Sequence, residues 1–488
     1  MKQKIALVHH PSVALKISGF ADSPFPAFAA SGIYLGNVYR RIMPPSLARV
    51  ASVLERHLPV DVRIVDLRAG DIEETIKTVD WEGYAIDIRR IGAPPPALDA
   101  VIDESDWLGF SSHFTFESGR VRELIAHAKQ RKPSIKVMVG GADVKARPAA
   151  YLAFGADYVC AGDFDPVAFA NHRGPQIVGP YRHPFAELTT PAFDKLPHLE
   201  RYTDSHDGPV PDGVRPPIGF PYLTRGCPRE CDFCESRRTK FETLDLDAAV
   251  GMFDHYHRAG VTTLNFADDN LLLMAATKDG RVKILELFRL LREMKFAWEF
   301  PNGLEIGRFA RGDGVDDELL TALLTHEVDP LTNRVVGGYR LYVPLESFDH
   351  RERYRKLKPF EEQNRVIRWL AQSGLEQINF GVVIPPDAEE ATFRGIADGF
   401  TALQQIIRTS GGMEARYAAF HLIPIAEFRG MRTKYSVDEF PEGWNFYFPV
   451  YDGTQMTARE LFERRIALVQ QIDPANFESM KIGQYTYA

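Results

Sequence analysis

Short apolar runs rich in β-branched residues alternate with helical patterns along most of this chain of 488 residues. Near the start, Lys4 to Val8 and Val62 to Asp66 flank an amphipathic stretch from Leu47 to Leu58. The same alternation continues to about Ala170. Strands that alternate with helices form a parallel sheet with helices on both faces, and such sheets bind ligands at the carboxyl ends of their strands. The sequence therefore predicts a doubly wound, Rossmann-like α/β domain over residues 1–170.

A different pattern follows, because residues 171–220 contain a proline every few positions and little periodicity. Proline at this density excludes helices and inner strands, so we interpret this section as a linker. Roughly six strand and helix pairs are expected over residues 221–425, and they predict a closed or partial β/α barrel of the TIM type. The first of these strands is expected to end at Arg225. The aromatic-rich remainder, residues 426–488, is expected to form a C-terminal α+β cap and substrate region.

Composition limits the class of partner. The formal net charge is −8, and no block of Lys and Arg marks a surface for nucleic acid or for a membrane. No apolar run reaches the roughly 18 residues that a membrane span needs, and the apolar run after the basic N-terminus is too short for a secretory signal. We therefore expect a cytoplasmic protein that neither binds nucleic acid nor spans a membrane.

Three of the four cysteines, Cys227, Cys231 and Cys234, lie close together. Four cysteines are too few for a disulfide framework in so long a chain, and clustered thiols in a reducing compartment indicate metal or redox chemistry. The C-x3-C-x2-C spacing puts three thiolates on one tight loop. They can ligate three irons of a cubane and leave one iron with an open coordination position, which invites a substrate.

The alternative for this triplet is a structural zinc site with three cysteines and one histidine. The candidate fourth ligands fit poorly, because His206 lies in the linker, and His255 and His257 are two positions apart on an expected helix and cannot face one ion together. Zinc sites also usually pair a C-x2-C with a second such pair. The remaining thiol, Cys160, is most simply a small buried apolar side chain.

The triplet, within Gly226-Cys227-Pro228 and the residues up to Cys234, resembles the radical S-adenosylmethionine (SAM) superfamily, whose defining motif has this spacing. The resemblance implies that the three cysteines ligate a 4Fe-4S cluster whose open iron binds the amino and carboxylate groups of SAM. It also implies reductive cleavage of SAM and radical chemistry on a small-molecule substrate: methylation, rearrangement or group transfer. A one-electron donor, such as flavodoxin, ferredoxin or a chemical reductant, is the expected partner.

The resemblance extends along the barrel in chain order. Asn265 to Asn270 follows the second expected strand and resembles the acidic motif that receives the SAM ammonium, whereas a solvated turn or a helix cap is the alternative. Leu345-Glu346-Ser347 resembles the fourth-strand element, with a satisfied barrel carboxylate as the alternative, and Val382 to Pro386 occupies the fifth-strand position beside adenine. The resemblance implies these SAM contacts: Phe233, Asp268, Asp269, Glu346, Ser347 and Ile384.

The N-terminal section resembles the cobalamin-binding-type domain that precedes the barrel in one large branch of the superfamily. Pro44 to Ala48, Gly109 to Ser112 and Gly155 to Asp163 recur there in this order. The histidine that ligates cobalt in an Asp-x-His-x-x-Gly motif is replaced here by Arg68. Members of the branch without this histidine include corrin-binding proteins and proteins that have lost the corrin, so both outcomes stay open. The candidate corrin contacts are Arg68, Ser111, His113, Gly140 and Gly141.

Three hypotheses for function follow. The leading one is a radical SAM enzyme of the cobalamin-domain type that methylates or rearranges a small molecule. The second is a corrin-free member that transfers the 3-amino-3-carboxypropyl group of SAM to a carbon or heteroatom acceptor. The third is a non-catalytic iron–sulfur or corrin sensor, which the series of strand-end motifs disfavours.

The cysteine assignment yields a direct test. Replacing Cys227, Cys231 or Cys234 with Ala is expected to remove the brown chromophore of the cluster and all cleavage of SAM, because each thiolate ligates one iron. Visible absorption, iron and acid-labile sulfide, and nucleoside products measure this. A variant that keeps full activity, or a protein that contains zinc and no labile sulfide, would contradict the assignment.

Overall fold

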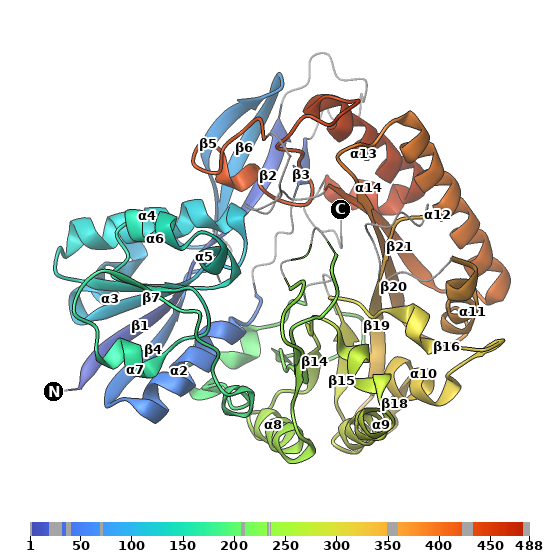
Figure 1. Cartoon of the computed structure of the whole chain (residues 1–488), viewed down its shortest axis with the longest axis horizontal. Coiled ribbons are helices and arrows are strands. Elements are labelled where there is room, and N and C mark those ends of the chain that lie inside the picture. Colours follow the sequence, from blue (N-terminus) through green and yellow to red (C-terminus); the bar gives the residue numbers. More distant parts are fainter. Residues whose placement is uncertain are drawn as a thin grey trace. The chain divides into compact units, whose positions relative to one another are not determined.

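The computed structural model describes residues 2–18, 32–35, 41–68, 72–205, 210–231, 234, 236–348, 360–421 and 433–481. The chain divides into two compact units, which Figure 1 shows with their elements labelled. The first unit contains Met1–Tyr202 and Thr433–Val450, and the second contains Thr203–Leu422 and Tyr451–Ala488. The domain limits expected at residues 170, 220 and 425 stay predictions.

The first unit is built on a parallel sheet of six strands in the order β10-β9-β8-β7-β1-β4. The strands are β1 (Gln3–His9), β4 (Val60–Asp66), β7 (Trp107–Ser111), β8 (Lys136–Gly140), β9 (Tyr158–Cys160) and β10 (Gln176–Val178). The helices are α2 (Pro45–His57), α3 (Asp99–Glu104), α4 (Ser118–Arg131), α5 (Ala142–Ala146), α6 (Pro148–Ala153) and α7 (Pro166–Ala170). Figure 1 shows α4 and α6 on one side of the sheet and α2 and α7 on the other. The predicted doubly wound fold is therefore confirmed.

Strand β7 shows why the sheet is covered on both faces. Leu108 and Phe110 join the apolar core that α3 to α6 pack against. Trp107 points to the opposite face, because successive side chains of a strand alternate, and its ring lies 4.7 Å from that of Phe169 on α7. A strand that is apolar at consecutive positions is buried on both faces, as parallel sheets between two helix layers require.

A four-stranded antiparallel sheet also belongs to the first unit, and the sequence analysis did not predict it. Its order is β3-β2-β6-β5, from β2 (Ser12–Ser18), β3 (Ile33–Leu35), β5 (Glu73–Trp81) and β6 (Tyr84–Ile91). Glu82 and Gly83 join β5 to β6 with φ values of 52° and 83°, the two positive angles of a type I′ hairpin. Buried Trp81 packs on Phe448, with ring centroids 4.1 Å apart.

The second unit contains six parallel strands in the order β11-β14-β15-β19-β20-β21, with one antiparallel strand, β18, beside β19. They are β11 (Ile218–Gly219), β14 (Thr263–Asn265), β15 (Ala297–Phe300), β18 (His326–Asp329), β19 (Arg334–Glu346), β20 (Gln377–Ile384) and β21 (Glu414–His421). The helices are α8 (Leu246–Arg258), α9 (Lys278–Glu293), α10 (Asp317–Leu324), α11 (Phe360–Leu370), α12 (Glu390–Ser410), α13 (Ala458–Ile472) and α14 (Pro474–Met480). Figure 1 shows α8 to α13 outside the curved sheet. The predicted partial β/α barrel is confirmed.

The first barrel strand is not the one that the sequence analysis expected. The strand that ends at Arg225 exists as β12 (Thr224–Arg225), but it pairs antiparallel with β13 (Glu242–Thr243) outside the barrel. The barrel begins instead at β11, directly after Pro216 and Pro217. An edge strand pairs on one side only and tolerates proline at its start, whereas an inner strand does not. Strand β10, also within the proline-rich section, is likewise an edge strand.

Helices of the second unit start at side chains that cap them. Asp245 Oδ1 accepts a hydrogen bond from the backbone N–H of Ala248 at 2.7 Å, at the start of α8. Thr277 caps α9 in the same way, and Thr457 forms a reciprocal capping box with Glu460 at the start of α13. Each cap satisfies a backbone donor that the helix leaves unpaired and stabilises its helix by about 1 kcal/mol.

The interior of the barrel contains a buried ion pair between neighbouring strands. Glu299 of β15 and Arg340 of β19 are 0% and 2% exposed, and Arg340 Nη1 lies 3.2 Å from Glu299 Oε2. Asn265 of β14 donates to the other oxygen of Glu299 at 2.6 Å. The pair is costly to desolvate, so it depends on these additional hydrogen bonds.

No helix among the residues described above combines the length and apolar character that a membrane crossing requires.

Breaking the barrel's ion pair is expected to destabilise the second unit. In Arg340→Met the carboxylate of Glu299 stays buried without its cation, which should lower the free energy of unfolding by about 3–5 kcal/mol. Arg311→Met is the matched control, because Arg311 is 54% exposed where it pairs with Asp316, and exposed pairs contribute at most about 1 kcal/mol. Denaturant titration measures both. Equal losses in the two variants would contradict this ranking.

Candidate active site

The cysteine loop leaves β12 and is closed at its far end by a threonine. The backbone N–H of Cys227 donates to Thr239 Oγ1 at 2.8 Å, and the N–H of Thr239 donates to the carbonyl of Cys227 at 3.0 Å. Cys227 and Cys231 are buried, Cys234 is partly exposed, and none of the four cysteines forms a disulfide. The three thiols of the motif therefore lie on one short, anchored loop.

Gly226 is required for the loop to turn. Its φ is 81°, in the left-handed region that favours glycine, and a Cβ there would lie 2.2 Å from the carbonyl oxygen of Lys240. Any larger residue would therefore force the returning strand away from the loop.

Asp268, just after β14, anchors the strand that leads into the loop. Its Oδ1 accepts hydrogen bonds from the backbone N–H groups of Leu223 and Thr224 and from the hydroxyl of Thr224, at 2.9, 2.5 and 2.8 Å. Its Oδ2 is buried and has no hydrogen-bond partner among the described residues. Burial raises the pKa of Asp268 to about 7, against the lowering effect of those hydrogen bonds. The orphan oxygen is a free acceptor at the carboxyl end of a barrel strand.

Asp269 holds the loop itself. Its Oδ2 accepts a hydrogen bond from the backbone N–H of Gly226 at 2.7 Å, and its Oδ1 accepts one from the hydroxyl of Ser236. These donors flank the three cysteines on either side. The carboxylate therefore fixes both ends of the loop to the end of β14.

Asn270 and its neighbours form a polar network beside Cys227 that the sequence analysis missed. The Nδ2 of Asn270 lies 3.9 Å from Cys227 Sγ and 3.1 Å from Glu305 Oε2. Glu305 also accepts hydrogen bonds from Arg229 at 2.6 Å and from Arg308 at 2.9 Å. Donors to a ligand sulfur tune the reduction potential of an iron–sulfur cluster. The asparagine directly after the Asp-Asp pair was the available signal in the sequence.

The remaining predicted SAM residues lie at the carboxyl ends of later strands. Glu346 ends β19 at a register irregularity, is 6% exposed and has a φ of 59°. A left-handed conformation at a non-glycine residue costs about 1–3 kcal/mol and is concentrated at functional sites. Ser347 follows it, and fully buried Ile384 ends the adjacent β20. Phe233 lies outside the described residues.

The donor set of the loop, three cysteines with an amide N–H beside one sulfur, fits an iron–sulfur cluster. Among the described residues, His57, His183 and Glu187 form the group whose three potential ligand atoms lie within 4.8 Å of one another, and the cysteines form no such group. The zinc alternative for Cys227, Cys231 and Cys234 stays an alternative interpretation of the same motif.

The first unit has its own candidate site at the carboxyl end of its sheet. Adjacent strands β1 and β7 are followed by helices on opposite faces, so their carboxyl ends form the topological switch point where such sheets bind ligands. His113, after β7, is exposed, and Ser111, Gly140 and Gly141 are partly exposed at the same edge. The structure thus brings four of the five predicted corrin residues to one edge, with an imidazole open to solvent.

Gly141 is required by the fold itself, whether or not it contacts a ligand. Its φ is 120°, and a Cβ there would lie 2.2 Å from the carbonyl oxygen of Ser112. The glycine is required where the loops after β7 and β8 meet, whatever occupies the edge of the sheet.

Arg68, the fifth predicted corrin residue, is held in a buried network that the sequence analysis missed. Its Nη2 lies 3.0 Å from Glu117 Oε1, and His10 Nε2 lies 3.7 Å from Glu117 Oε2. Burial would raise the pKa of Glu117, but His10 and Arg68 lower it to about 2. Burial lowers the pKa of His10 to about 4. The network therefore contains an ionised carboxylate, and the doublet His9-His10 at the end of β1 was its signal in the sequence.

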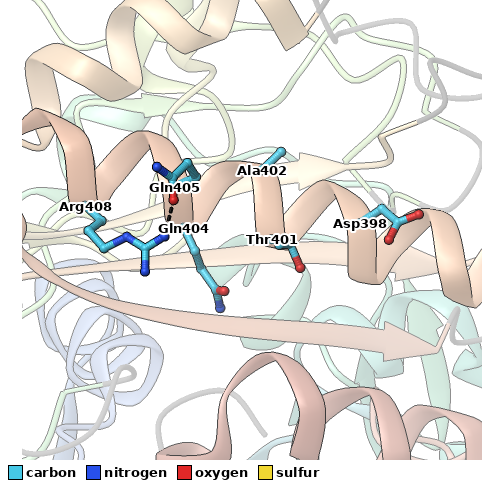
Figure 2. Close-up of a pocket in the computed structure, with 6 residues that line it drawn as sticks. All are labelled: Asp398, Thr401, Ala402, Gln404, Gln405 and Arg408. Atoms are coloured by element: carbon cyan, nitrogen blue, oxygen red, sulfur yellow. Dashed lines mark hydrogen bonds between the residues drawn. The ribbon is translucent and has the colours of Figure 1, made fainter.

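A depression of about 580 Å³ on α12 does not belong to either site (Figure 2). Its lining residues all come from one exposed face of that helix: Asp398, Thr401, Ala402, Gln404, Gln405 and Arg408. The residues repeat at helical spacing and none follows the carboxyl end of a barrel strand. We therefore assign no function to it.

Comparisons with known proteins agree with this geometry. Residues 32–169 match the family model described as a B12 binding domain. The cytidylyl-2-hydroxyethylphosphonate methyltransferase of Streptomyces wedmorensis is 22% identical over 402 residues, which cover 70% of this chain and 69% of the relative.

Among solved structures, the radical S-adenosylmethionine methyltransferase TsrM from Kitasatospora setae, with cobalamin and a 4Fe-4S cluster bound, matches with a TM-score of 0.57 at 16% identity. The match covers 98% of this chain and 90% of that one. The predicted resemblance is confirmed at this level: residues 32–169 match the B12-binding model, and the chain shares its overall fold with the radical SAM methyltransferase TsrM.

Proposed function

We propose that the protein is a cobalamin-dependent radical SAM enzyme that methylates a small-molecule substrate. The observation that carries this proposal is the combination of a B12-binding-type domain in the first unit with an anchored loop of three cysteines in the second. Both matched proteins are named as methyltransferases. Methylation is therefore favoured over rearrangement and over transfer of the 3-amino-3-carboxypropyl group.

In the second unit, Cys227, Cys231 and Cys234 are the proposed ligands of a 4Fe-4S cluster. When bound, the cluster supplies an electron for cleavage of SAM, and the corrin carries the methyl group. The buried Oδ2 of Asp268 is the proposed acceptor for the SAM ammonium, because it is aligned by three hydrogen bonds on Oδ1 and has no donor among the described residues. Asp269 is proposed to contribute to the site by holding the cysteine loop in place.

The ends of the later strands complete the proposed SAM site. Glu346 and Ser347 supply polar groups for the ribose or methionyl end, and the left-handed backbone of Glu346 redirects the chain there. Ile384 offers an apolar side chain to the adenine. Phe233, between the second and third cysteines, stays a proposed contact from the resemblance alone.

In the first unit, Ser111, His113, Gly140 and Gly141 are the proposed corrin contacts. Of these four residues, His113 has an exposed imidazole whose nitrogen is a potential cobalt ligand. Its backbone is fixed, because its N–H donates a hydrogen bond to Glu117 Oε2 at 3.2 Å. Arg68 contributes through its ion pair with the same carboxylate. The loops after β1, β4 and β7 are thus tied to one buried anion.

The chemistry also implies a partner and a compartment. A one-electron donor, such as flavodoxin or ferredoxin, is proposed to reduce the cluster. The four cysteines, none of which forms a disulfide, fit the reducing conditions of the cytoplasm.

Nucleoside products test the proposal. Anaerobic enzyme with its cluster reconstituted and hydroxocobalamin bound is incubated with SAM and a reductant. We expect 5′-deoxyadenosine, together with S-adenosylhomocysteine in an amount that follows the bound cobalamin. Chromatography with mass detection measures both, and Cys227→Ala is the control that should form neither. Formation of 5′-methylthioadenosine would instead support carboxypropyl transfer, and the absence of every nucleoside would support a sensor.

Paired substitutions separate the roles of the two aspartates. Asp268→Asn keeps an acceptor for the backbone of β12 but replaces the orphan acceptor with a donor, so iron content should stay normal while SAM affinity falls about tenfold or more. Asp269→Asn places an amide N–H against one of its two donors, so iron content should fall. Iron assays and equilibrium binding of SAM measure the two effects.

The pKa of Asp268 gives the same experiment a pH dependence. Only the ionised form accepts the ammonium, so SAM should bind more tightly as the pH rises through about 7, and this rise should vanish in Asp268→Asn. The opposite result would contradict the proposed roles. In that result, Asp268→Asn loses iron, and Asp269→Asn loses SAM affinity at full iron content.

A further inference from the structure

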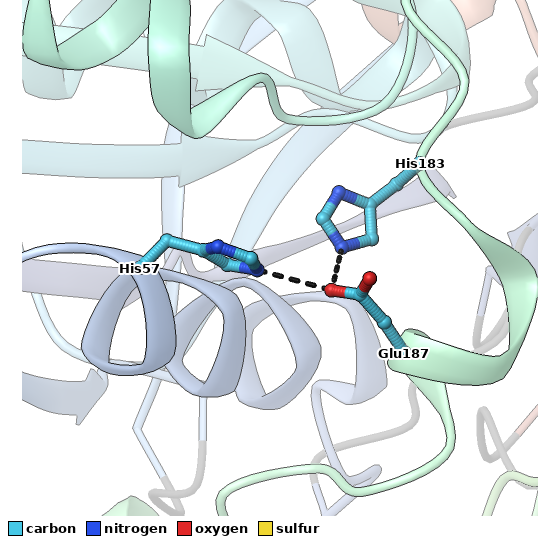
Figure 3. Close-up of side chains that lie close together, drawn as sticks. All are labelled: His57, His183 and Glu187. Atoms are coloured by element: carbon cyan, nitrogen blue, oxygen red, sulfur yellow. Dashed lines mark hydrogen bonds and ion pairs between the residues drawn. The ribbon is translucent and has the colours of Figure 1, made fainter.

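Two histidines and a glutamate of the first unit bring their side chains together away from the loops described above (Figure 3). His57 is the last residue of α2, His183 precedes the short 3-10 helix Phe185–Leu188, and Glu187 lies within that helix. Glu187 Oε2 lies 3.0 Å from His57 Nε2 and 3.2 Å from His183 Nε2. Among the described residues, no other histidines, cysteines or carboxylates bring three such atoms within 4.8 Å of one another.

These separations are those of ligands around one small cation. Zinc binds histidine nitrogen and carboxylate oxygen at about 2.0–2.2 Å in tetrahedral geometry, which places neighbouring ligand atoms about 3.3 Å apart. Two imidazoles and one carboxylate form a common ligand set for Zn²⁺, and they leave a fourth position for water. In Figure 3 both imidazoles direct their Nε2 atoms at the same carboxylate oxygen.

The surroundings hold the ligands in place. His183 is 2% exposed, its Nδ1 lies 3.4 Å from the hydroxyl of Tyr181, and its backbone N–H donates to Asp163 Oδ2 at 2.8 Å. Partners on the outer nitrogen of a ligating imidazole fix its orientation and raise metal affinity. The side chains of His57 and Glu187 are 35% and 37% exposed, so an ion has access from solvent.

One cation already lies close to this cluster. Arg56 Nη1 is 3.7 Å from Glu187 Oε2 and donates to the backbone carbonyl of Glu187 at 2.9 Å, while Nη2 donates to Thr190 Oγ1 at 2.8 Å. Its charge lowers affinity for a second cation. Its hydrogen bonds are directed mainly to the backbone carbonyl of Glu187 and to Thr190, however, and not to either imidazole.

We propose that His57, His183 and Glu187 bind a divalent transition-metal ion of the zinc class. The ion would fasten the last turn of α2 to residues 183–187, which are far from it in sequence. His57 lies three residues before β4 begins, toward the amino ends of the parallel strands, whereas the corrin candidates lie at the carboxyl ends. His183 and Glu187 also lie beyond the matched residues 32–169. The inference is therefore independent of the proposed function.

Cobalt binding to the cluster-reconstituted protein tests the proposal. The iron–sulfur cluster occupies the thiols, so Co²⁺ should bind elsewhere with one equivalent, show the visible bands of a four- or five-coordinate ion with nitrogen and oxygen ligands, and be displaced by Zn²⁺. His57→Gln and Glu187→Gln should each lower affinity about tenfold or more. His183→Ala removes a buried side chain and is expected to destabilise the fold as well, so the two more accessible positions carry the test.

His127→Ala is the matched control, because His127 Nε2 lies 2.7 Å from a single carboxylate, that of Asp99, and no second imidazole joins them. Its Co²⁺ affinity should equal that of the parent. Zn²⁺ should also raise the melting temperature of the parent and of His127→Ala but not of His57→Gln.

Three results would overturn the proposal. They are the absence of stoichiometric Co²⁺ binding, unchanged affinity in His57→Gln and Glu187→Gln, and thiolate-to-cobalt charge-transfer bands, which would put the ion on cysteine. In each case His57, His183 and Glu187 form a hydrogen-bonded triad and not a metal site. Thiolate bands would also show that the cysteine loop does not hold its cluster, whereas the other two results leave SAM-derived products unaffected. Failure of this inference and failure of the proposed function are therefore distinguishable.

Discussion

Hydrogen bonds from the backbone of residues 223–226 to Asp268 and Asp269 are the interaction on which the candidate active site depends. The residues of the cysteine loop that the structure describes form no regular strand or helix, so their conformation relies on these two carboxylates and on Thr239. A hydrogen bond to a charged acceptor contributes about 1.5–3 kcal/mol. Three thiolates that repel one another could not be kept together on so short a segment without such an anchor.

Each unit buries a carboxylate at the carboxyl ends of its strands, and the two carboxylates have different roles. At the carboxyl ends of its strands, the second unit buries Asp268 with an oxygen left open and a raised pKa. The first unit buries Glu117 at the corresponding edge of its sheet, but the cation of Arg68 compensates it and its pKa is lowered. A compensated carboxylate shapes a loop, whereas an uncompensated one is ready for a cationic ligand.

The sequence predicted what depends on local pattern and missed what depends on distant pairing. Alternating strands and helices indicated both parallel sheets, and the cysteine spacing located the loop. The antiparallel sheet was missed although Glu82-Gly83 marks its hairpin, because β2 and β6 are far apart in the chain. Likewise, no periodicity indicates that Asn270 meets Glu305 or that His57 meets Glu187, since each pair is joined only by the folded chain. Edge strands in a proline-rich section, such as β11, likewise show no sequence pattern that predicts them.

The path of the chain between the units has a consequence for how the protein can be dissected. Residues 433–450 return to the first unit, where Phe448 fills space against Trp81, and residues 451–481 then rejoin the second. A single break after Tyr202 would leave the N-terminal fragment without an aromatic part of its own core and the C-terminal fragment with an orphaned insertion. Evolutionary exchange of either half, or its expression in isolation, must therefore carry two separate stretches of polypeptide.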